Sequence, residues 1–514
     1  MLSPHRQNPS AVIIGGGLGG LGTAALLARA GHPVTLLEKN PQVGGRANVF
    51  SADGFTFDMG PSWYLMPDVF ERFFRLLGTT PETELDLVKL SPSYRLFFEG
   101  KRETLDLFAD VDKSAALFNS LEPGAGAKLR AYLDVSRRQY DIIISSLMYK
   151  NASSFSDFID WKMIKAGLSL PAFSSMHSYV ARFFKTEVLQ QIMQYQLLFL
   201  GSLPFHAPSL YNIMGHIDFN MGVYYPRGGI YTVVQAIRRI AENHGAVVRV
   251  NAPVRAITVA NGRATGVELD NGERISADLV ISNADIHHTE TALLPAKARS
   301  FSPRYWQKRS LAPSALILYL GVRGRVSSMI HHNILFAKNW NASFRELFEG
   351  RNWPENPSLY VCCPSKSDAG VAPPECETMF VLMPIAAGLD YSEAIQQTYA
   401  DRALDLIASH MGVPDLRERI AFMRIYCGND FARDYNSFRG SALGLAHTLM
   451  QTAVFRPANV SKKLPNLFYA GAGTNPGIGM PSCLISAELA FKRIRGIRSG
   501  APLASFQEPA AAQA

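Results

Sequence analysis

The sequence predicts an α/β protein in which a nucleotide-binding domain is assembled from separated parts of the chain. First, residues 11–38 have the pattern of a strand, a glycine-rich turn, a helix and a second strand that ends on an acid. Second, a strand and turn over 467–474, followed by a small-residue helix over 482–494, lie near the other end of the 514-residue chain. A domain that begins at 11 and finishes near 494 must be discontinuous, so the residues between them form a second domain.

The first turn carries the G-x-G-x-x-G spacing, at Gly15, Gly17 and Gly20. The first glycine permits the tight turn, the second lets the backbone approach a pyrophosphate, and the third lets the helix pack closely on the strand. The N–H groups at the helix N-terminus then face the phosphates. Glu38 follows the second strand, over 34–37, where its carboxylate can accept both ribose hydroxyls. This favours an unphosphorylated ribose, as in FAD or NAD, on a Rossmann-type unit.

A secretory signal is the competing interpretation of the same residues. Residues 11–28 carry no charge, basic residues precede them, and residues 28–30 imitate a signal-peptidase site. Glycine, however, fills much of the supposed apolar segment, and a strand with a terminal acid follows directly. The complete strand, turn, helix and strand therefore favour nucleotide binding.

Two further glycine turns follow Glu38. Residues 43–47 form a tight turn that contains the cation Arg46, and residues 54–62 form a strand that runs into a second close turn. Each could be an ordinary β-turn, and a nicotinamide-binding fold needs neither. Their order behind the nucleotide motif indicates a two-domain flavoprotein in which they hold an extended flavin.

The middle of the chain changes from helical to strand patterns. In residues 95–205 apolar positions recur every three or four residues, which predicts helices with broad apolar faces. Residues 222–290 and 314–322 return to strand character, with hairpin turns at 261–262 and 271–272. We therefore expect a Rossmann-type FAD-binding domain in three segments (8–95, 206–300 and 441–498), a helical substrate-binding and membrane-associating region (96–205), a mixed-sheet substrate domain (301–440) and a flexible tail (499–514).

Bulk composition gives weaker indications. The net charge of +8 suits weak attraction to anionic lipid headgroups, but it is equally compatible with no particular partner. The five cysteines form no C-x-x-C pair, and we interpret them as thiols in a reducing compartment. Apart from the glycine-rich segment, no apolar run reaches the roughly 20 residues that a spanning helix needs, so a membrane role would be peripheral.

Adjacent histidines occur at 287–288 and at 331–332. Neighbouring residues in a strand point to opposite faces, and the same applies to Cys362 and Cys363. No H-x-H or H-x-x-x-H spacing joins the histidines to a carboxylate. The sequence therefore predicts no metal site.

A set of motifs runs in order along almost the whole chain. They are GGGLGGLG with Glu38, GGRA from Gly44, FDMGPS from Phe57, GSLPFHAPSLY from Gly201, GVYYPRGGIY from Gly222, ISNAD from Ile281, His331-His332-Asn333, PSLYVCCPSKSDAGVAPP from Pro357 and NLFYAGAGTNPGIGMP from Asn466. In these motifs the chain resembles the bacterial-type phytoene desaturase family, within the wider flavin amine oxidase-like group. Asn475 departs from the last motif, where the family usually has His, Gln or Thr, and this leaves the subfamily open.

The resemblance implies FAD as the cofactor. It implies that the glycine turn holds the pyrophosphate, that Glu38 holds the adenosine ribose, that the backbone of Val254 meets adenine and that Arg46 lies near the phosphates or the flavin. The residues implied to contact FAD are Gly15, Gly17, Gly20, Glu38, Lys39, Gly45, Arg46, Gly60, Pro61, Ser62, Val254, Gly473, Thr474, Gly479 and Met480.

The resemblance also implies desaturation of phytoene or a related acyclic carotene, toward neurosporene or lycopene. Flavin N5 would accept a hydride and a base would take the neighbouring proton, in an apolar tunnel. Asp157 matches a family segment whose carboxylate is a candidate acid/base, although Ser156 stands where some members have Arg. A carboxylate in such a tunnel would have a raised pKa. The alternative, and the commoner role of such an Asp, is that Asp157 caps the helix that starts beside it.

Two other activities suit the same fold. One is a redox-neutral carotenoid cis–trans isomerase that uses reduced FAD, and the other is a flavin amine oxidase-like enzyme acting on a polar amine. A non-catalytic lipid-binding role would leave the complete cofactor loops unexplained. The expected partners are a hydrophobic carotenoid, a membrane surface bound peripherally, and oxygen or a quinone as electron acceptor. We expect no nucleic-acid partner and a cytoplasmic location, and the sequence sets no oligomeric state.

Overall fold

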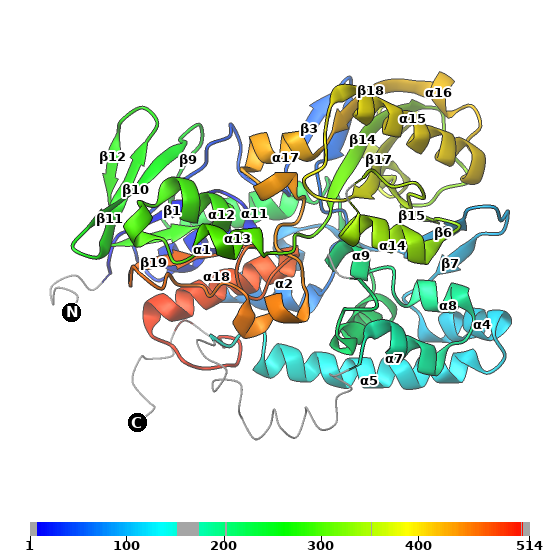
Figure 1. Cartoon of the computed structure of the whole chain (residues 1–514), viewed down its shortest axis with the longest axis horizontal. Coiled ribbons are helices and arrows are strands. Elements are labelled where there is room, and N and C mark those ends of the chain that lie inside the picture. Colours follow the sequence, from blue (N-terminus) through cyan, green and yellow to red (C-terminus); the bar gives the residue numbers. More distant parts are fainter. Residues whose placement is uncertain (1–7, 152–173, 201–202, 351, 505, 507–514) are drawn as a thin grey trace.

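The computed structural model describes residues 8–151, 174–200, 203–350, 352–504 and 506. Its two main sheets lie beside one another, with helix α5 (Ala125–Ser146) running beneath them in the view of Figure 1. The predicted α/β class is confirmed.

The first sheet has five parallel strands in the order β19–β13–β1–β2–β9. Its strands are β1 (Ala11–Ile14), β2 (Val34–Leu37), β9 (Val247–Arg249), β13 (Leu279–Ser282) and β19 (Leu467–Tyr469). The runs AVII and LVIS are buried along their whole length, as expected for parallel strands that are covered on both faces. Residues from both ends and from the middle of the chain therefore share one sheet.

Helices and a small sheet cover the two faces of this parallel sheet. Helices α1 (Leu18–Arg29), α11 (Tyr231–Asn243) and α18 (Met480–Arg495) pack together over one face. The antiparallel sheet β10 (Val254–Ala260), β11 (Arg263–Leu269) and β12 (Arg274–Ser276) covers the other. Two-stranded pairs, β3 (Val49–Ala52) with β4 (Phe55–Asp58) and β5 (Leu87–Lys89) with β8 (Tyr224–Pro226), complete this half.

The second sheet is mixed and has the order β18–β14–β17–β16–β15–β6–β7. Its strands are β6 (Tyr94–Phe98), β7 (Leu105–Leu107), β14 (Ser314–Arg323), β15 (His332–Phe336), β16 (Leu359–Cys362), β17 (Cys376–Ile385) and β18 (Ile420–Tyr426). Alternate residues of β14 face opposite ways, as strand geometry requires. Leu316, Leu318 and Leu320 pack under helix α15 (Glu393–His410), whereas Ala315 and Ile317 face the rest of the molecule.

The expectation of helices from residue 95 onward is wrong for its first part. Tyr94–Phe98 and Leu105–Leu107 form β6 and β7 at the edge of the mixed sheet. The run YRLFF is rich in aromatic residues, which favour strands when a neighbouring strand covers them. The helical segment begins only at α4 (Val111–Leu121).

The remaining helices are short and surround the two sheets. They are α2 (Pro67–Leu76), α3 (Pro81–Glu84), α7 (Met176–Phe183), α8 (Glu187–Ile192), α9 (Leu197–Leu200), α10 (Ile213–Gly215), α12 (Ile286–His288), α13 (Pro303–Gln307), α14 (Trp340–Glu349), α16 (Leu416–Arg419) and α17 (Gly428–Tyr435). A π-helical segment, His216–Met221, follows α10 directly. Among the described helices, none combines the length and the apolar character that crossing a bilayer requires.

The tail expected from Ser499 is described in part. Leu503 is buried, and its N–H donates to the Glu488 carboxylate of α18 at 2.7 Å. This stretch therefore packs on the helix, while residues 507–514 lie outside the described residues.

Candidate functional site

A cavity of about 1110 Å³ runs between the parallel sheet and the mixed sheet. Its lining includes most of the residues that the sequence implies for a cofactor: Gly15, Gly17, Glu38, Lys39, Gly45, Arg46, Gly60, Pro61, Ser62, Val254, Gly479 and Met480. Gly20, Gly473 and Thr474 lie outside this lining, and Asp157 lies outside the described residues.

The glycine turn between β1 and α1 places the N-terminus of α1 at one end of the cavity. Gly15 has φ +95°, which favours glycine. A Cβ on Gly20 would lie 2.1 Å from the Gly15 carbonyl oxygen, so Gly20 serves the close packing of helix on strand. Gly17 caps α1 without a side-chain hydrogen bond. The first N–H groups of α1 are therefore available to an anion in the cavity.

Glu38 lies beside this turn, at the end of β2, and is 5% exposed. One carboxylate oxygen accepts the N–H of Gly16 at 2.7 Å, and the other accepts the N–H of Asn40 at 2.9 Å. Each carboxylate oxygen can accept more than one hydrogen bond. Glu38 thus braces the turn and still has acceptor capacity for ligand hydroxyls.

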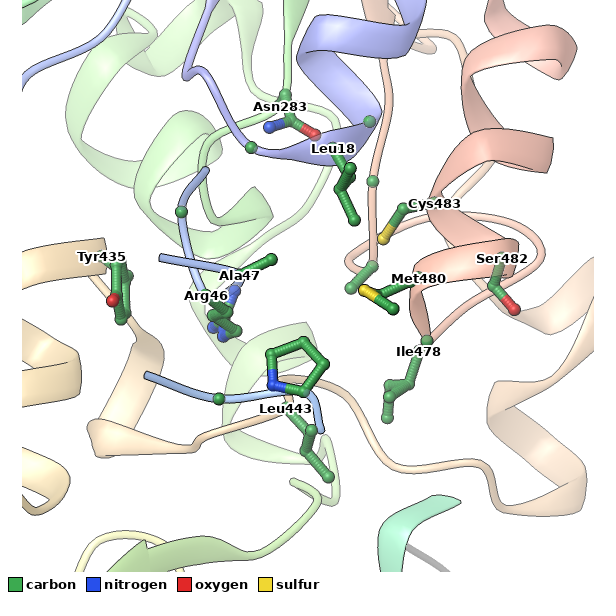
Figure 2. Close-up of a pocket in the computed structure, with 18 of the residues that line it drawn as sticks. Leu18, Arg46, Ala47, Asn283, Tyr435, Leu443, Ile478, Met480, Ser482 and Cys483 are labelled. Carbon is green, nitrogen blue, oxygen red and sulfur yellow. The ribbon is translucent and has the colours of Figure 1, made fainter. Parts of the chain in front are cut away.

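Lys39 and Arg46 bring positive charge to the same region. The Lys39 ammonium donates to the backbone carbonyl of Arg433 at the end of α17. The Arg46 guanidinium donates to the Ser437 hydroxyl at 2.5 Å and lies over the Tyr435 ring. Its Nε–H is buried and has no hydrogen-bond partner within the described part of the chain. Figure 2 shows Arg46 in the middle of the pocket, between Tyr435 and Met480.

The C-terminal motif forms the opposite wall. Gly479, at φ +115°, begins α18 without a side-chain cap, so a second helix N-terminus opens on the cavity. Gly473 lines a small neighbouring cavity of about 40 Å³. The Thr474 hydroxyl donates to the Pro457 carbonyl at 2.6 Å, so this side chain stabilises the loop from behind.

These features fit an extended dinucleotide. Two helix N-termini without side-chain caps and the Arg46 Nε–H, which has no partner among the described residues, suit anionic phosphates, and the Glu38 carboxylate suits ribose hydroxyls. A Cβ on Gly60 would lie 2.4 Å from the Arg46 carbonyl, which explains the glycine in that turn.

Three polar residues of this region were not singled out from the sequence. Asn283 follows β13, and its amide donates to the Gly15 carbonyl at 3.2 Å, beside the glycine turn (Figure 2). His447 lines the cavity, and its Nε2 accepts the N–H of Ile478 at 3.1 Å. The buried Arg456 guanidinium donates to the Ala472 and Thr474 carbonyls, and burial lowers its pKa to about 10. Asn283 had a usable signal, because ligands of parallel sheets bind at the carboxyl ends of strands.

The rest of the cavity is mostly apolar. Its walls there come from the mixed sheet, from α5 and the turn after it, and from the segments around residues 210–217 and 452–455. The residues are Leu65, Met66, Ile143, Leu147, Met148, Leu210, Tyr211, Ile213, Met214, Ile217, Ala315, Ile317, Tyr360, Phe380, Leu382, Val454 and Phe455. A long hydrocarbon would bury its surface on such walls.

Asp218 is a buried carboxylate behind this wall. It accepts hydrogen bonds from the hydroxyls of Tyr94 at 3.2 Å and Tyr195 at 2.7 Å, and from the amide of Gln196. Gln196 itself lines the cavity. Burial raises the pKa of Asp218 from 3.8 to about 7. The π-helical turn His216–Met221 places this residue inward.

The raised pKa of Asp218 predicts a pH-dependent stability. The folded chain binds the proton more tightly than the unfolded chain, so this contribution is complete below pH 4 and is lost as pH rises toward 7. A shift of this size corresponds to at most about 4 kcal/mol. In Asp218→Asn we expect the free energy of unfolding to fall less between pH 4 and 7 than in the parent. Asp58, whose pKa is also raised to about 7, is present in both proteins. The free energy of unfolding is measured by denaturant titration at each pH. If it falls equally with pH in both proteins, the assignment to Asp218 is wrong.

The prediction that the adjacent histidines lie in a strand and point to opposite faces, which excluded a metal site, is wrong. His331 precedes β15 instead of lying within it, and the His331 and His332 rings are only 4.4 Å apart between centroids. Residues 286–288 form α12, so the other histidine pair is not in a strand either. The structure brings His331, His332 and Cys362 together.

Comparison with known proteins gives concordant matches. The family model described as flavin containing amine oxidoreductase matches residues 18–494. A carotenoid 3,4-desaturase from Haloarcula japonica is 44% identical over 479 residues, 93% of this chain and 96% of the relative. A zeta-carotene-forming phytoene desaturase from Myxococcus xanthus is 34% identical over 500 residues, 96% of this chain and 95% of the relative. Putrescine oxidase, solved with putrescine bound, shares the fold with a TM-score of 0.61 at 13% identity, over 95% of this chain and 99% of that one.

Proposed function

The chain belongs to the flavin-containing amine oxidoreductase family, and we propose that it is an FAD-dependent carotenoid desaturase acting on phytoene or a related acyclic carotene. The observation that carries the proposal is one cavity whose polar end is lined by the nucleotide-binding motif and whose other end is apolar. When bound, FAD supplies the two-electron acceptor for the hydride that leaves the substrate.

The places of these residues in the cavity support the cofactor roles that the resemblance implies. We assign the pyrophosphate to the Gly15–Gly17 turn and the α1 N-terminus, the ribose to Glu38 and the adenine to the backbone near Val254. Arg46, Gly60 and the N-terminus of α18 would hold the flavin half. Thr474 acts indirectly, through the loop that it stabilises.

The apolar walls orient the polyene and exclude water. Exclusion of water matters because a hydride transfer is protected from side reactions only in a dry site. The activities named for both relatives are desaturations, so no specific observation favours isomerisation or amine oxidation. The 44% identity to a 3,4-desaturase favours a second candidate, 3,4-desaturation of a carotene that is already partly desaturated.

One assay tests these candidates together. The purified FAD-loaded protein is given 15-cis-phytoene, poly-cis lycopene or all-trans lycopene in liposomes, under air or with a quinone, and the pigments are followed by absorbance. Stepwise red-shifted products from phytoene support phytoene desaturation, and a red shift from lycopene alone supports 3,4-desaturation. FAD-loaded protein that changes neither substrate, or that only converts poly-cis to all-trans lycopene, would contradict the proposal.

Asp157 remains the residue that we propose as proton acceptor. Removal of a general base costs about 10²- to 10⁴-fold in rate. We expect Asp157→Asn to lose turnover within this range at normal FAD content. Full turnover with normal FAD content would remove Asp157 from the mechanism and leave the capping role.

We also propose that the protein takes its substrate from a membrane surface, through the rim of the cavity formed by residues 450–455. Met450 is 61% exposed and Phe455 is 43% exposed, and Phe455 also lines the cavity. Exposed apolar side chains at the mouth of an apolar cavity suit insertion into a lipid interface, and the net charge of +8 favours an anionic one.

This rim predicts a specific loss of membrane binding. The double variant Met450→Ser/Phe455→Ser should bind anionic liposomes about ten-fold more weakly in a flotation assay, because it removes two apolar side chains from the interface. The matched control is Met423→Ser, which removes a side chain that is 39% exposed on β18, outside the cavity lining. Equal binding of the two variants to the liposomes would contradict the assignment of residues 450–455 as the membrane-binding rim.

A further inference from the structure

The structure assigns a buried Zn²⁺ site to His331, His332 and Cys362, behind the wall of the substrate cavity. This inference does not rest on the proposed function. His332 and Cys362 are directly opposite partners in the β15–β16 ladder, and His331 immediately precedes β15. The three side chains are each at most 3% exposed.

The ligand atoms are close enough to share one ion. One nitrogen from each histidine and the Cys362 sulfur lie within 4.8 Å of one another. Zinc binds imidazole nitrogen at about 2.0–2.1 Å and thiolate sulfur at about 2.3 Å, so small side-chain rotations close the site. Three protein ligands leave a fourth position for water.

Hydrogen bonds hold each imidazole at Nδ1, which leaves Nε2 for a metal. The Nδ1 of His331 lies 2.9 Å from the Ser367 hydroxyl, and the Nδ1 of His332 lies 2.9 Å from the Tyr360 hydroxyl. Both Nε2 atoms are buried and have no hydrogen-bond partner among the residues that the structure describes. Metal-ligating histidines usually show this arrangement, in which one ring nitrogen bonds the metal and the other bonds a fixed polar group.

The donor set selects the class of metal. Two imidazoles and one thiolate suit Zn²⁺, whereas Ca²⁺ and Mg²⁺ require oxygen ligands. On binding, the Cys362 thiol releases its proton to solvent and its sulfur bonds the ion, with no change in oxidation state. Cys362 also interacts with the hydroxyls of Ser62 and Tyr360, which line the cavity. The ion would therefore fix the cavity wall.

The neighbouring cysteine provides a matched control. Cys363 is fully buried one position along, and its sulfur lies 3.8 Å from the Met329 sulfur in the core on the other face of the sheet. Full-length FAD-loaded protein is prepared from zinc-containing medium, desalted into metal-free buffer and analysed for zinc by mass spectrometry. We expect about one zinc per chain in the parent and in Cys363→Ser, and less than about a tenth in Cys362→Ser and His331→Asn.

A second measurement uses only the parent protein, so it tests the site even if a variant fails to fold. Co²⁺ added to metal-free parent protein should give tetrahedral absorption bands on the red side of the flavin bands, and these should disappear on addition of Zn²⁺. FAD content of the same samples reports folding and the cofactor site independently. Parent protein that carries FAD but takes up neither metal, or Cys362→Ser that retains as much zinc as Cys363→Ser, would overturn the site and leave the proposed function intact.

Discussion

Gly20→Ala is expected to destabilise the nucleotide-binding unit strongly, whereas Gly17→Ala is expected to keep its stability and to lose affinity for FAD. A Cβ on Gly20 would lie 2.1 Å from the Gly15 carbonyl oxygen, where neither backbone segment can move without breaking the contact of α1 with β1. We expect a loss of roughly 3 kcal/mol or more in the free energy of unfolding. Circular dichroism melting of the FAD-free protein measures it.

Gly17 differs because its added Cβ would lie 3.0 Å from the Asn283 amide nitrogen and 4.0 Å from the Gly44 carbonyl oxygen, and its backbone is extended at φ −72°. Under the proposed assignment of the pyrophosphate to this turn, the methyl group would instead occupy the space of the bound pyrophosphate. We expect FAD affinity to fall by about 10- to 100-fold, the equivalent of a 1–3 kcal/mol steric cost, with little change in melting of the FAD-free protein. If both variants melt alike, the separate roles of the two glycines are wrong.

Ala315→Phe is expected to abolish carotenoid turnover while leaving FAD bound. Ala315 is on the face of β14 that lines the apolar part of the cavity, opposite the face that packs under α15. Because Ala315 lines the cavity, a phenyl ring at this position would take up part of the cavity volume. Because even small misplacement of a reacting group is costly, we expect a fall of about 100-fold or more in turnover.

The control for this variant is Ala315→Ser, which scarcely changes the volume. It should retain turnover within a few-fold of the parent, and both variants should keep the parent's FAD content and flavin spectrum. Ala315→Phe that turns over carotenoid normally would show that the substrate does not pass this face of the mixed sheet.

Local patterns in the sequence were enough to predict the nucleotide-binding unit. Strands 11–14 and 34–37 and the helix ending at Asn243 are found where the patterns place them. This works because the glycine spacing, a buried β-branched run and a terminal acid act within one short stretch of chain. The resemblance then identified the family, and it extends over nearly the whole chain.

Errors arose where neighbours distant in sequence decide the structure. Residues 95–98 are predicted as helical from their local pattern, but β15, more than 200 residues later, pairs with them and makes them a strand. The histidine pair at 331–332 was judged as part of a regular strand, although the strand begins only at His332. Asp218 gave no signal at all, because its tyrosine partners come from other segments.

The sequence was therefore sufficient for the fold class, the cofactor and the family, since these depend on motifs whose residues act on their immediate neighbours. The folded chain alone revealed which residues line the apolar cavity between the sheets, and it alone revealed the buried Asp218 network and the cluster of His331, His332 and Cys362. Each of these depends on contacts between residues that are far apart in the sequence. Local sequence patterns do not identify which distant side chains will meet.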